Sequence, residues 1–207
     1  MEDGMNVRTK KIVNISLLMV ALCLIGIYLY DKYVNEKIDQ TPSELLNDQW
    51  PKMTIGTMGL SVQIPVNLDR TEVTLPEDAQ KTIEKMEIYA RENYKGLTIT
   101  ANSIKYLSVI DSVSLAGGAI GTMNGIRDAE GVEDFQYRQE NSLKNGVPGY
   151  LQRGSYKQDG KEYAFINAGY GQDLNFWQVM VLYYENSDNG KTVAERIIGS
   201  IEITVKK

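Results

Sequence analysis

The amino-acid sequence predicts an α+β domain, mainly an antiparallel β-sheet flanked by helices in an α/β/α sandwich, preceded by one transmembrane helix. Three observations predict this architecture. Residues 12–30 are apolar and uncharged, four β-prone segments follow one another between residues 135 and 185, and helical patterns occupy residues 111–127 and 190–200. A sheet that is apolar on both faces needs cover on both, which two helices can supply.

The segment 12–30 is long enough to cross a bilayer once. At about 1.5 Å rise per residue it reaches roughly 28 Å, close to the ~30 Å thickness of the hydrocarbon core. The basic residues Arg8, Lys10 and Lys11 crowd its amino side, and fewer basic residues flank the other side. The positive-inside bias therefore predicts a cytoplasmic N-terminus and an extracytoplasmic C-terminal domain at the cytoplasmic membrane.

Two alternatives to a permanent anchor fit the same residues less well. A cleaved signal peptide needs small residues just after a short apolar core, but here the core continues into Tyr28, Leu29 and Tyr30. A lipidated cysteine would follow a small residue, but Leu22 precedes Cys23 and the apolar run continues beyond it. The sequence favours an anchor that is retained, with Cys23 as a small apolar residue within it.

The chain therefore divides into four parts, and one of them is large enough to bury a core. These parts are a cytoplasmic N-terminus over residues 1–11, the transmembrane helix over 12–30, a polar tether over 31–50 and an extracytoplasmic domain over 51–207.

Composition excludes several classes of function. The chain has no histidine among its 207 residues, so histidine-based nucleophilic sites and histidine-ligated zinc are excluded. Its one cysteine lies in the anchor, so the domain has no disulfide. The formal net charge is −5 and basic residues do not form runs, so nucleic acid is not an expected partner. We expect no catalytic residues, no metal site and no cofactor, although a carboxylate-dependent enzyme remains an alternative.

The first half of the domain carries two strand signals. Residues 60–64 alternate apolar and polar side chains as a half-buried strand does, and Pro65 ends them. Residues 75–107 fit either a helix or strands, because residues 86–90 match both periods. We favour a β-hairpin turning at residues 93–96, preceded by a short helical turn.

Residues 111–127 give the strongest helix signal, with Asp111 or Ser112 as N-cap and an apolar side formed by Leu115, Ala119, Met123 and Ile126. Gly117, Gly121 and Gly125 recur every four residues, at a cost of about 1 kcal/mol each relative to alanine. We expect a strand to approach this glycine stripe closely, and the alternative is a groove for a partner or ligand.

From residue 132 onward the pattern predicts a β-meander. The expected strands are residues 135–142, 149–157, 162–170 and 175–185, separated by turns at residues 145–146, 159–160 and 171–173. Residues 175–184 are apolar on both sides, so this strand should be central. A last helix at 190–200 and a closing strand at 201–205 complete the domain.

Five segments in this order resemble the PsbP-like superfamily, which includes the photosystem protein PsbP, the envelope protein DcrB and the Ran-binding Mog protein. They are GLSVQIP at 59–65, the glycine-bearing helix before residues 128–134, GVPGYLQRGSY at 146–156, FWQVMVLYY at 176–184 and AERIIGSIEI at 194–203. The resemblance covers residues 53–205. It implies an antiparallel sheet between helices that binds other proteins, with no family catalytic residues to carry over. The anchor departs from the soluble eukaryotic members.

Two clusters remain. Tyr150, Tyr156, Tyr163 and Tyr170 lie on adjacent predicted strands, where they stabilise the sheet or line a peptide or carbohydrate surface. The acidic loop of Asp128, Glu130, Glu133 and Asp134 does not match a calcium-binding loop and is interpreted as solvated.

Taken together, these patterns predict a non-catalytic, single-pass envelope domain. We expect it to contact the membrane through residues 12–30 and to bind another envelope protein or assist assembly outside the cytoplasmic membrane. A small-ligand or carbohydrate-binding domain is the alternative, and self-association through the membrane segment stays open.

Overall fold

The structure of the protein, a computed structural model, describes residues 41–72, 81–109 and 111–205. They belong to one compact unit, Gln40–Lys207. Its elements are α3 (Glu44–Asn47), β1 (Lys52–Ile55), β2 (Leu60–Gln63), β3 (Asp69–Thr71), β4 (Ile83–Tyr94), β5 (Leu97–Tyr106), α5 (Leu115–Arg127), β6 (Val132–Lys144), β7 (Val147–Gln158), β8 (Lys161–Gln172), β9 (Asn175–Tyr184), α6 (Asp188–Gly199) and β10 (Glu202–Ile203).

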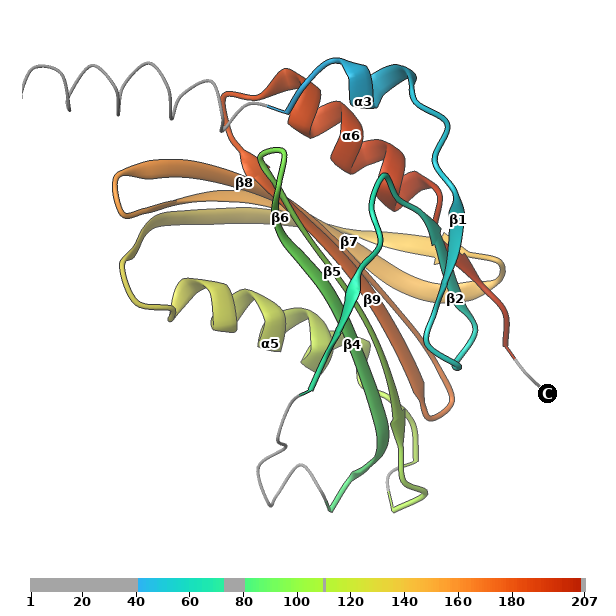
Figure 1. Cartoon of the computed structure of the whole chain (residues 1–207). Helices are drawn as coiled ribbons and strands as arrows, with labels where there is room; N and C mark the ends of the chain where they lie inside the picture. The colour runs from blue at the N-terminus through green and yellow to red at the C-terminus, as the bar shows by residue number, and fades with distance from the viewer. Residues whose placement is uncertain (1–40, 73–80, 110, 206–207) are drawn as a thin grey trace, which may run out of the picture. The chain divides into compact units, whose positions relative to one another are not determined.

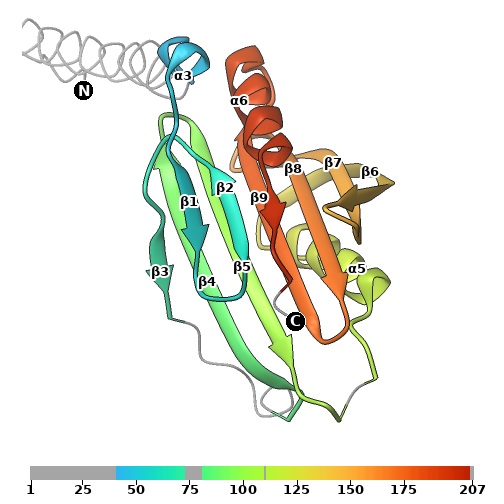
Figure 2. The same ribbon diagram turned by 90° about the vertical axis from the view of Figure 1, so that its right-hand side faces the viewer.

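The described strands form two antiparallel sheets (Figures 1 and 2). The larger has seven strands in the order β3-β4-β5-β9-β8-β7-β6, and the smaller has the order β1-β2-β10. The predicted meander is confirmed, as is the central position of β9 and the hairpin of β4 and β5. The turns at Asn145-Gly146 and Asp159-Gly160 have positive φ at both residues, the backbone that a two-residue hairpin requires.

The two faces of the large sheet are covered differently. The strands β8 and β9 contact α6 on one face, and β6, β7 and β8 contact α5 on the other (Figure 1). The small sheet joins α6 on its side, where β2 contacts α6 and β1 contacts β5. The predicted arrangement, a mainly antiparallel sheet flanked by helices, is therefore confirmed, with a second sheet that the sequence did not indicate.

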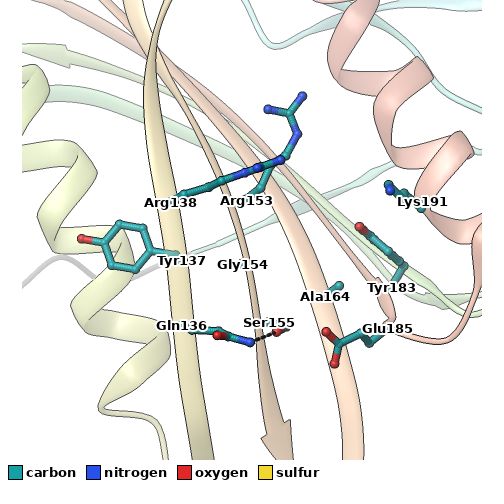
Figure 3. A pocket seen from close by; sticks show the side chains of 10 residues that line it. All are labelled: Gln136, Tyr137, Arg138, Arg153, Gly154, Ser155, Ala164, Tyr183, Glu185 and Lys191. Carbon is teal, nitrogen blue, oxygen red and sulfur yellow. Dashed lines mark hydrogen bonds between the residues drawn. The ribbon is translucent and has the colours of Figure 1, made fainter.

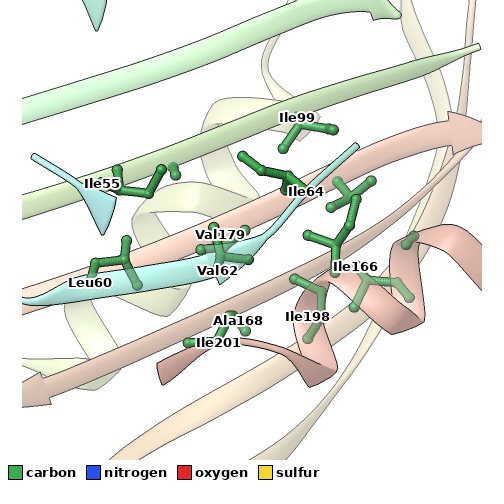
Figure 4. Close-up of a cluster of buried hydrophobic side chains, with 14 of the residues drawn as sticks. Ile55, Leu60, Val62, Ile64, Ile99, Ile166, Ala168, Val179, Ile198 and Ile201 are labelled. Carbon is green, nitrogen blue, oxygen red and sulfur yellow. The ribbon is translucent and has the colours of Figure 1, made fainter. Parts of the chain in front are cut away.

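The main core lies between the large sheet and the layer made of α6 and the small sheet. Leu60 and Val62 from β2, Val179 from β9 and Ile198 from α6 meet there and are buried (Figure 4). The alternation in β9 explains this, because Trp177, Val179, Val181 and Tyr183 all face this core while Phe176 faces α5. Burying such side chains contributes roughly 1.5–3 kcal/mol each before the entropy cost of ordering them.

Helix α5 begins later than predicted. Its N-cap is Ser114, whose side chain accepts a hydrogen bond from the Gly117 backbone N–H at 3.0 Å, rather than Asp111 or Ser112. The predicted apolar side is confirmed, since Ala119 and Met123 are buried and Leu115 and Ile126 pack beside them. Hydrophobic spacing located the contact face correctly. The choice of N-cap among Asp111, Ser112 and Ser114 depends on the backbone conformation, which the spacing does not show.

Residues 41–50, predicted as part of a polar tether, belong to the folded domain. Leu45 of α3 and Trp50 are buried in the main core. The guanidinium of Arg196 from α6 stacks on the Trp50 ring and donates to the carbonyls of Leu46 and Asp48. The boundary predicted at residue 51 was too late because Leu45, Leu46 and Trp50 are too few apolar residues to give a periodic signal.

Among residues 41–72, 81–109 and 111–205, no helix is long and apolar enough to cross a bilayer. The segment 12–30, predicted as the anchor, lies outside those residues, as does most of the helical turn predicted just before the first hairpin.

Candidate functional site

A hollow opens on the α6 side of the large sheet, between α6 and the outer strands. It has a volume of about 480 Å³. Its lining comes from β6, β7, β8, the end of β9 and the first turn of α6: Gln136, Tyr137, Arg138, Arg153, Gly154, Ser155, Ala164, Tyr183, Glu185 and Lys191. Figure 3 shows this groove, with Arg138 and Arg153 on the strand side and Lys191 on the helix side.

The groove is rich in cations although the whole protein is acidic. Its lining contains three basic side chains and one carboxylate, Glu185, whereas the formal net charge of the chain is −5. Arg138 and Arg153 are directly opposite each other on β6 and β7. Arg153 donates to Glu140 at 2.5 Å, which neutralises part of this charge.

Small side chains and a phenol form the floor of the groove. Ala164 leaves the strand surface open there, and Ser155 accepts a hydrogen bond from Gln136 at 3.2 Å. Burial raises the pKa of Tyr183, and Glu195 and Glu185 raise it further against the opposing effect of Arg153. The phenol therefore keeps its proton at neutral pH and can donate a hydrogen bond to a ligand.

A second hollow of about 330 Å³ continues the groove along α6 and shares Arg153 with it. Its charges are Lys144, Glu195 and the shared Arg153. Lys144 donates to the carbonyl of Gly199 at 2.7 Å, which joins β6 to the C-terminal end of α6. The excess of basic over acidic side chains is therefore larger in the first hollow.

The opposite face of the sheet holds a ladder of amide side chains beneath α5, which the sequence analysis missed. Hydrogen bonds of 2.7–2.9 Å connect five side chains across five strands, in the order Gln139, Gln152, Asn167, Gln178 and Asn102. Gln152 also donates to the Ala119 carbonyl at 3.1 Å, and Gln178 donates to the Thr122 hydroxyl at 2.8 Å. The ladder thus fixes α5 over the sheet by directional bonds as well as by apolar contacts.

The outward side of α5 carries the glycine stripe. Ala116, Gly117, Ile120, Gly121 and Gly125 are all exposed and together define what we call the α5 outer face. A Cβ added at Gly121 or Gly125 would meet nothing within 4 Å, so the predicted close approach of a strand is wrong. The tight contact belongs instead to Gly118, where a Cβ would lie 3.1 Å from the Phe176 ring.

The four tyrosines do not form one surface. Tyr150, Tyr156 and Tyr163 face α5, whereas Tyr170 faces the main core, because it pairs with Gly149 rather than with a residue of the α5 side. Tyr150, Tyr156 and Tyr170 are buried and Tyr163 is half-buried, so the four side chains do not form one open surface. Tyr156 and Tyr163 stack across strands with ring centroids 5.5 Å apart, a contact of the kind that stabilises a sheet.

Tyr150 is almost completely buried beneath α5. Burial raises the pKa of Tyr150 to about 12, although Thr122 and Asn167 lie on its hydroxyl side and oppose the shift. Within the described residues its hydroxyl makes no hydrogen bond of standard geometry. The phenol therefore stays protonated under α5 and acts as part of the packing.

The acidic side chains of this loop are either in one of two ion pairs or exposed to solvent. Asp128 accepts from the neighbouring Arg127 at 2.7 Å, and Asp134 lies 3.1 Å from the Lys157 ammonium group. In the described parts of the chain, acidic, cysteine and histidine side chains do not gather in any group of three that could hold a metal ion.

Comparison with known proteins identifies the fold. No family model and no curated protein matches the sequence. The solution structure of cyanobacterial PsbP (CyanoP) from Synechocystis sp. PCC 6803 superposes with a TM-score of 0.51 at 10% identity, over 74% of this chain and 92% of that one. The fold of this domain is PsbP-like. LpqN of Mycobacterium tuberculosis, which is involved in cell envelope biogenesis, is similar at a TM-score of 0.43 and 12% identity, over 80% of this chain and 97% of that one.

The PsbP-like fold agrees with the resemblance found in the sequence segments. At 10% identity the likeness concerns the fold alone, so the functional residues of this chain must be argued from its own surface. Two surfaces stand out there, the α5 outer face and the cation-rich groove.

Proposed function

We propose that this chain is a non-catalytic, membrane-anchored envelope domain that binds another protein or assists assembly outside the cytoplasmic membrane. The anchor in this proposal is the apolar segment 12–30. The binding surface is the α5 outer face. The observation that carries the proposal is the exposure of Ile120, Gly121 and Gly125 on a helix that has no charged residue before its last one, Arg127.

A solvent-facing helix surface without charge is unusual in a protein of which 24% is charged. Ile120 is 56% exposed, and glycine on either side of it leaves a flat area of backbone that another protein could approach closely. Gly121 and Gly125 weaken the helix by about 1 kcal/mol each, although a Cβ at either position would meet nothing within 4 Å, so a contact outside the domain supplies the reason for them.

Photocrosslinking and affinity capture of the full chain from detergent-solubilised membranes test the partner surface. The tagged wild-type chain should retain a defined partner, and Ile120→Glu should lose it because a charge in an interface core is left desolvated. Leu143→Glu is the matched control, because Leu143 is also an exposed apolar residue, at 69%, but lies on β6. Equal recovery of the same partner by wild type and Ile120→Glu would reject the α5 outer face.

A separate measurement tests on which side of the membrane the domain lies. Protease added to intact protoplasts should remove the domain if it lies outside the cytoplasmic membrane with the N-terminus inside. Complete protection in intact protoplasts, with digestion after lysis, would overturn the orientation while leaving the binding surface to its own test.

A further inference from the structure

Two arginines face each other in the groove at a cost to the sheet. Arg138 and Arg153 are direct cross-strand partners of β6 and β7, and both line the hollow on the α6 side. Like charges placed directly opposite each other destabilise an antiparallel pair. An anion between the two guanidinium groups would remove this repulsion.

The local acidic residues satisfy only one of the two arginines. Arg153 is paired with Glu140, its diagonal neighbour on β6. Within residues 41–72, 81–109 and 111–205, neither Arg138 nor Lys191 of α6 makes an ion pair or a side-chain hydrogen bond, and both are exposed at the rim of the groove. Two cations are thus available on opposite walls of one hollow.

The remaining lining suits a small molecule rather than a flat protein surface. The volume of about 480 Å³ lies within the range of small-ligand sites, roughly 300–1,000 Å³. Ala164 leaves the floor open, and the phenol oxygen of Tyr183 is drawn between the strand residues and Lys191 in Figure 3. Glu185 at the other end would accept a hydrogen bond from a hydroxyl or ammonium group and would repel a second anion.

We propose that this groove binds a small anion whose carboxylate or phosphate group lies between Arg138 and Arg153, with Lys191 and the Tyr183 hydroxyl as further donors. Guanidinium groups bind both kinds of oxyanion through paired N–H donors, so a carboxylate and a phosphate would bind in the same way. The site lies on the opposite face of the sheet from α5, so it stands independently of the proposed partner surface.

Calorimetric titration of the full chain in a nonionic detergent, at low ionic strength, tests this site with two probes, citrate for carboxylates and pyrophosphate for phosphates. At least one probe should bind with one-to-one stoichiometry. Arg138→Gln should weaken that binding about tenfold or more, because it removes a charge-assisted donor. Glu140→Gln should tighten it about threefold, because Arg153 is then released from its carboxylate.

Two controls separate a binding role from a structural one. Arg70→Gln removes an exposed arginine at the other edge of the sheet, on β3, and should leave the affinity within about twofold. Arg138→Gln should unfold at the same temperature as wild type or higher, because cross-strand repulsion is relieved. Failure of both probes to bind the wild-type chain would overturn the proposal, as would equal weakening by Arg70→Gln and Arg138→Gln.

Discussion

The guanidinium carbon of Arg196 lies 3.8 Å from the centre of the Trp50 ring. The same side chain donates to the Leu46 carbonyl at 3.1 Å and to the Asp48 carbonyl at 2.8 Å. One arginine of α6 therefore binds both the ring and the backbone of the segment that enters the domain. Because a lysine cannot present a planar fork to a ring and two carbonyls together, this contact is specific to arginine.

We predict that Arg196→Lys lowers the free energy of unfolding by about 1–2 kcal/mol and that Trp50→Ala lowers it by about 3–5 kcal/mol. Urea unfolding of the full chain measures both. Arg70→Lys, an exposed arginine on β3, should change stability by less than about 0.5 kcal/mol. If Trp50→Ala leaves the stability unchanged, residues 41–50 belong to the tether and not to the folded domain.

Alanine at the exposed glycines of α5 should stabilise the domain. Gly121→Ala and Gly125→Ala are each expected to raise the free energy of unfolding by about 1 kcal/mol, because the added methyl group meets nothing and helix propensity improves. Gly169→Ala is the contrasting variant, since its Cβ would lie 2.3 Å from the Tyr150 ring and should destabilise the sheet. A loss of stability in Gly121→Ala would show that this helix face is already covered within the chain.

Removing the middle of the amide ladder should cost more than a surface hydrogen bond. Asn167→Ala leaves the Gln152 oxygen and a Gln178 donor without this partner under α5, so we expect a loss of about 2–3 kcal/mol. Gln136→Ala removes one hydrogen bond at an exposed position and should cost less than about 1 kcal/mol. Thermal unfolding of both variants compares the two, and equal losses would contradict a buried, cooperative ladder.

Glu87 should make the domain sensitive to acid. Burial by itself would raise the pKa of Glu87, but the Thr57 backbone N–H at 2.8 Å and the Lys85 ammonium at 3.1 Å together lower it below its usual value. A carboxylate with a lowered pKa in the folded state stabilises the fold above its unfolded pKa, and this contribution disappears as the pH falls through the folded pKa.

The wild-type chain should therefore lose more stability between about pH 7 and about pH 3 than Glu87→Gln does. Urea unfolding at the two pH values measures the difference. Glu84→Gln, an exposed residue of the same strand that pairs with Lys105, should follow the wild-type pH dependence. If Glu87→Gln and wild type lose equal stability, the carboxylate does not hold the β1–β2 turn through its charge.

The sequence predicted those parts of the fold that rest on local periodicity. Alternation located the four long strands and placed β9 at the centre, and helical spacing identified the buried side of α5. Pairing between distant segments could not be predicted in the same way. The small sheet depends on β2 meeting β10, and neither strand is long enough to carry a signal about its partner.

The candidate sites were harder to predict for the same reason. Gln152, Asn167 and Gln178 are single polar residues on apolar strands, and only the register shows that they align into one ladder. Arg138 and Arg153 look like ordinary surface charges until β6 pairs with β7. The glycine stripe was recognised as unusual, but a helix wheel cannot tell whether such a face meets a strand or solvent, and here Gly121 meets solvent.

The pairing of Ser61 with Glu202 has a consequence for how the chain is made. The hairpin of β1 and β2 is synthesised early. Leu60 and Val62 become buried only when α6 and β10 have also been synthesised. Folding of the domain must therefore wait for nearly the whole polypeptide, and contacts of such long sequence separation form slowly. During translation, the early hairpin would rely on chaperones to keep its apolar side chains from aggregating.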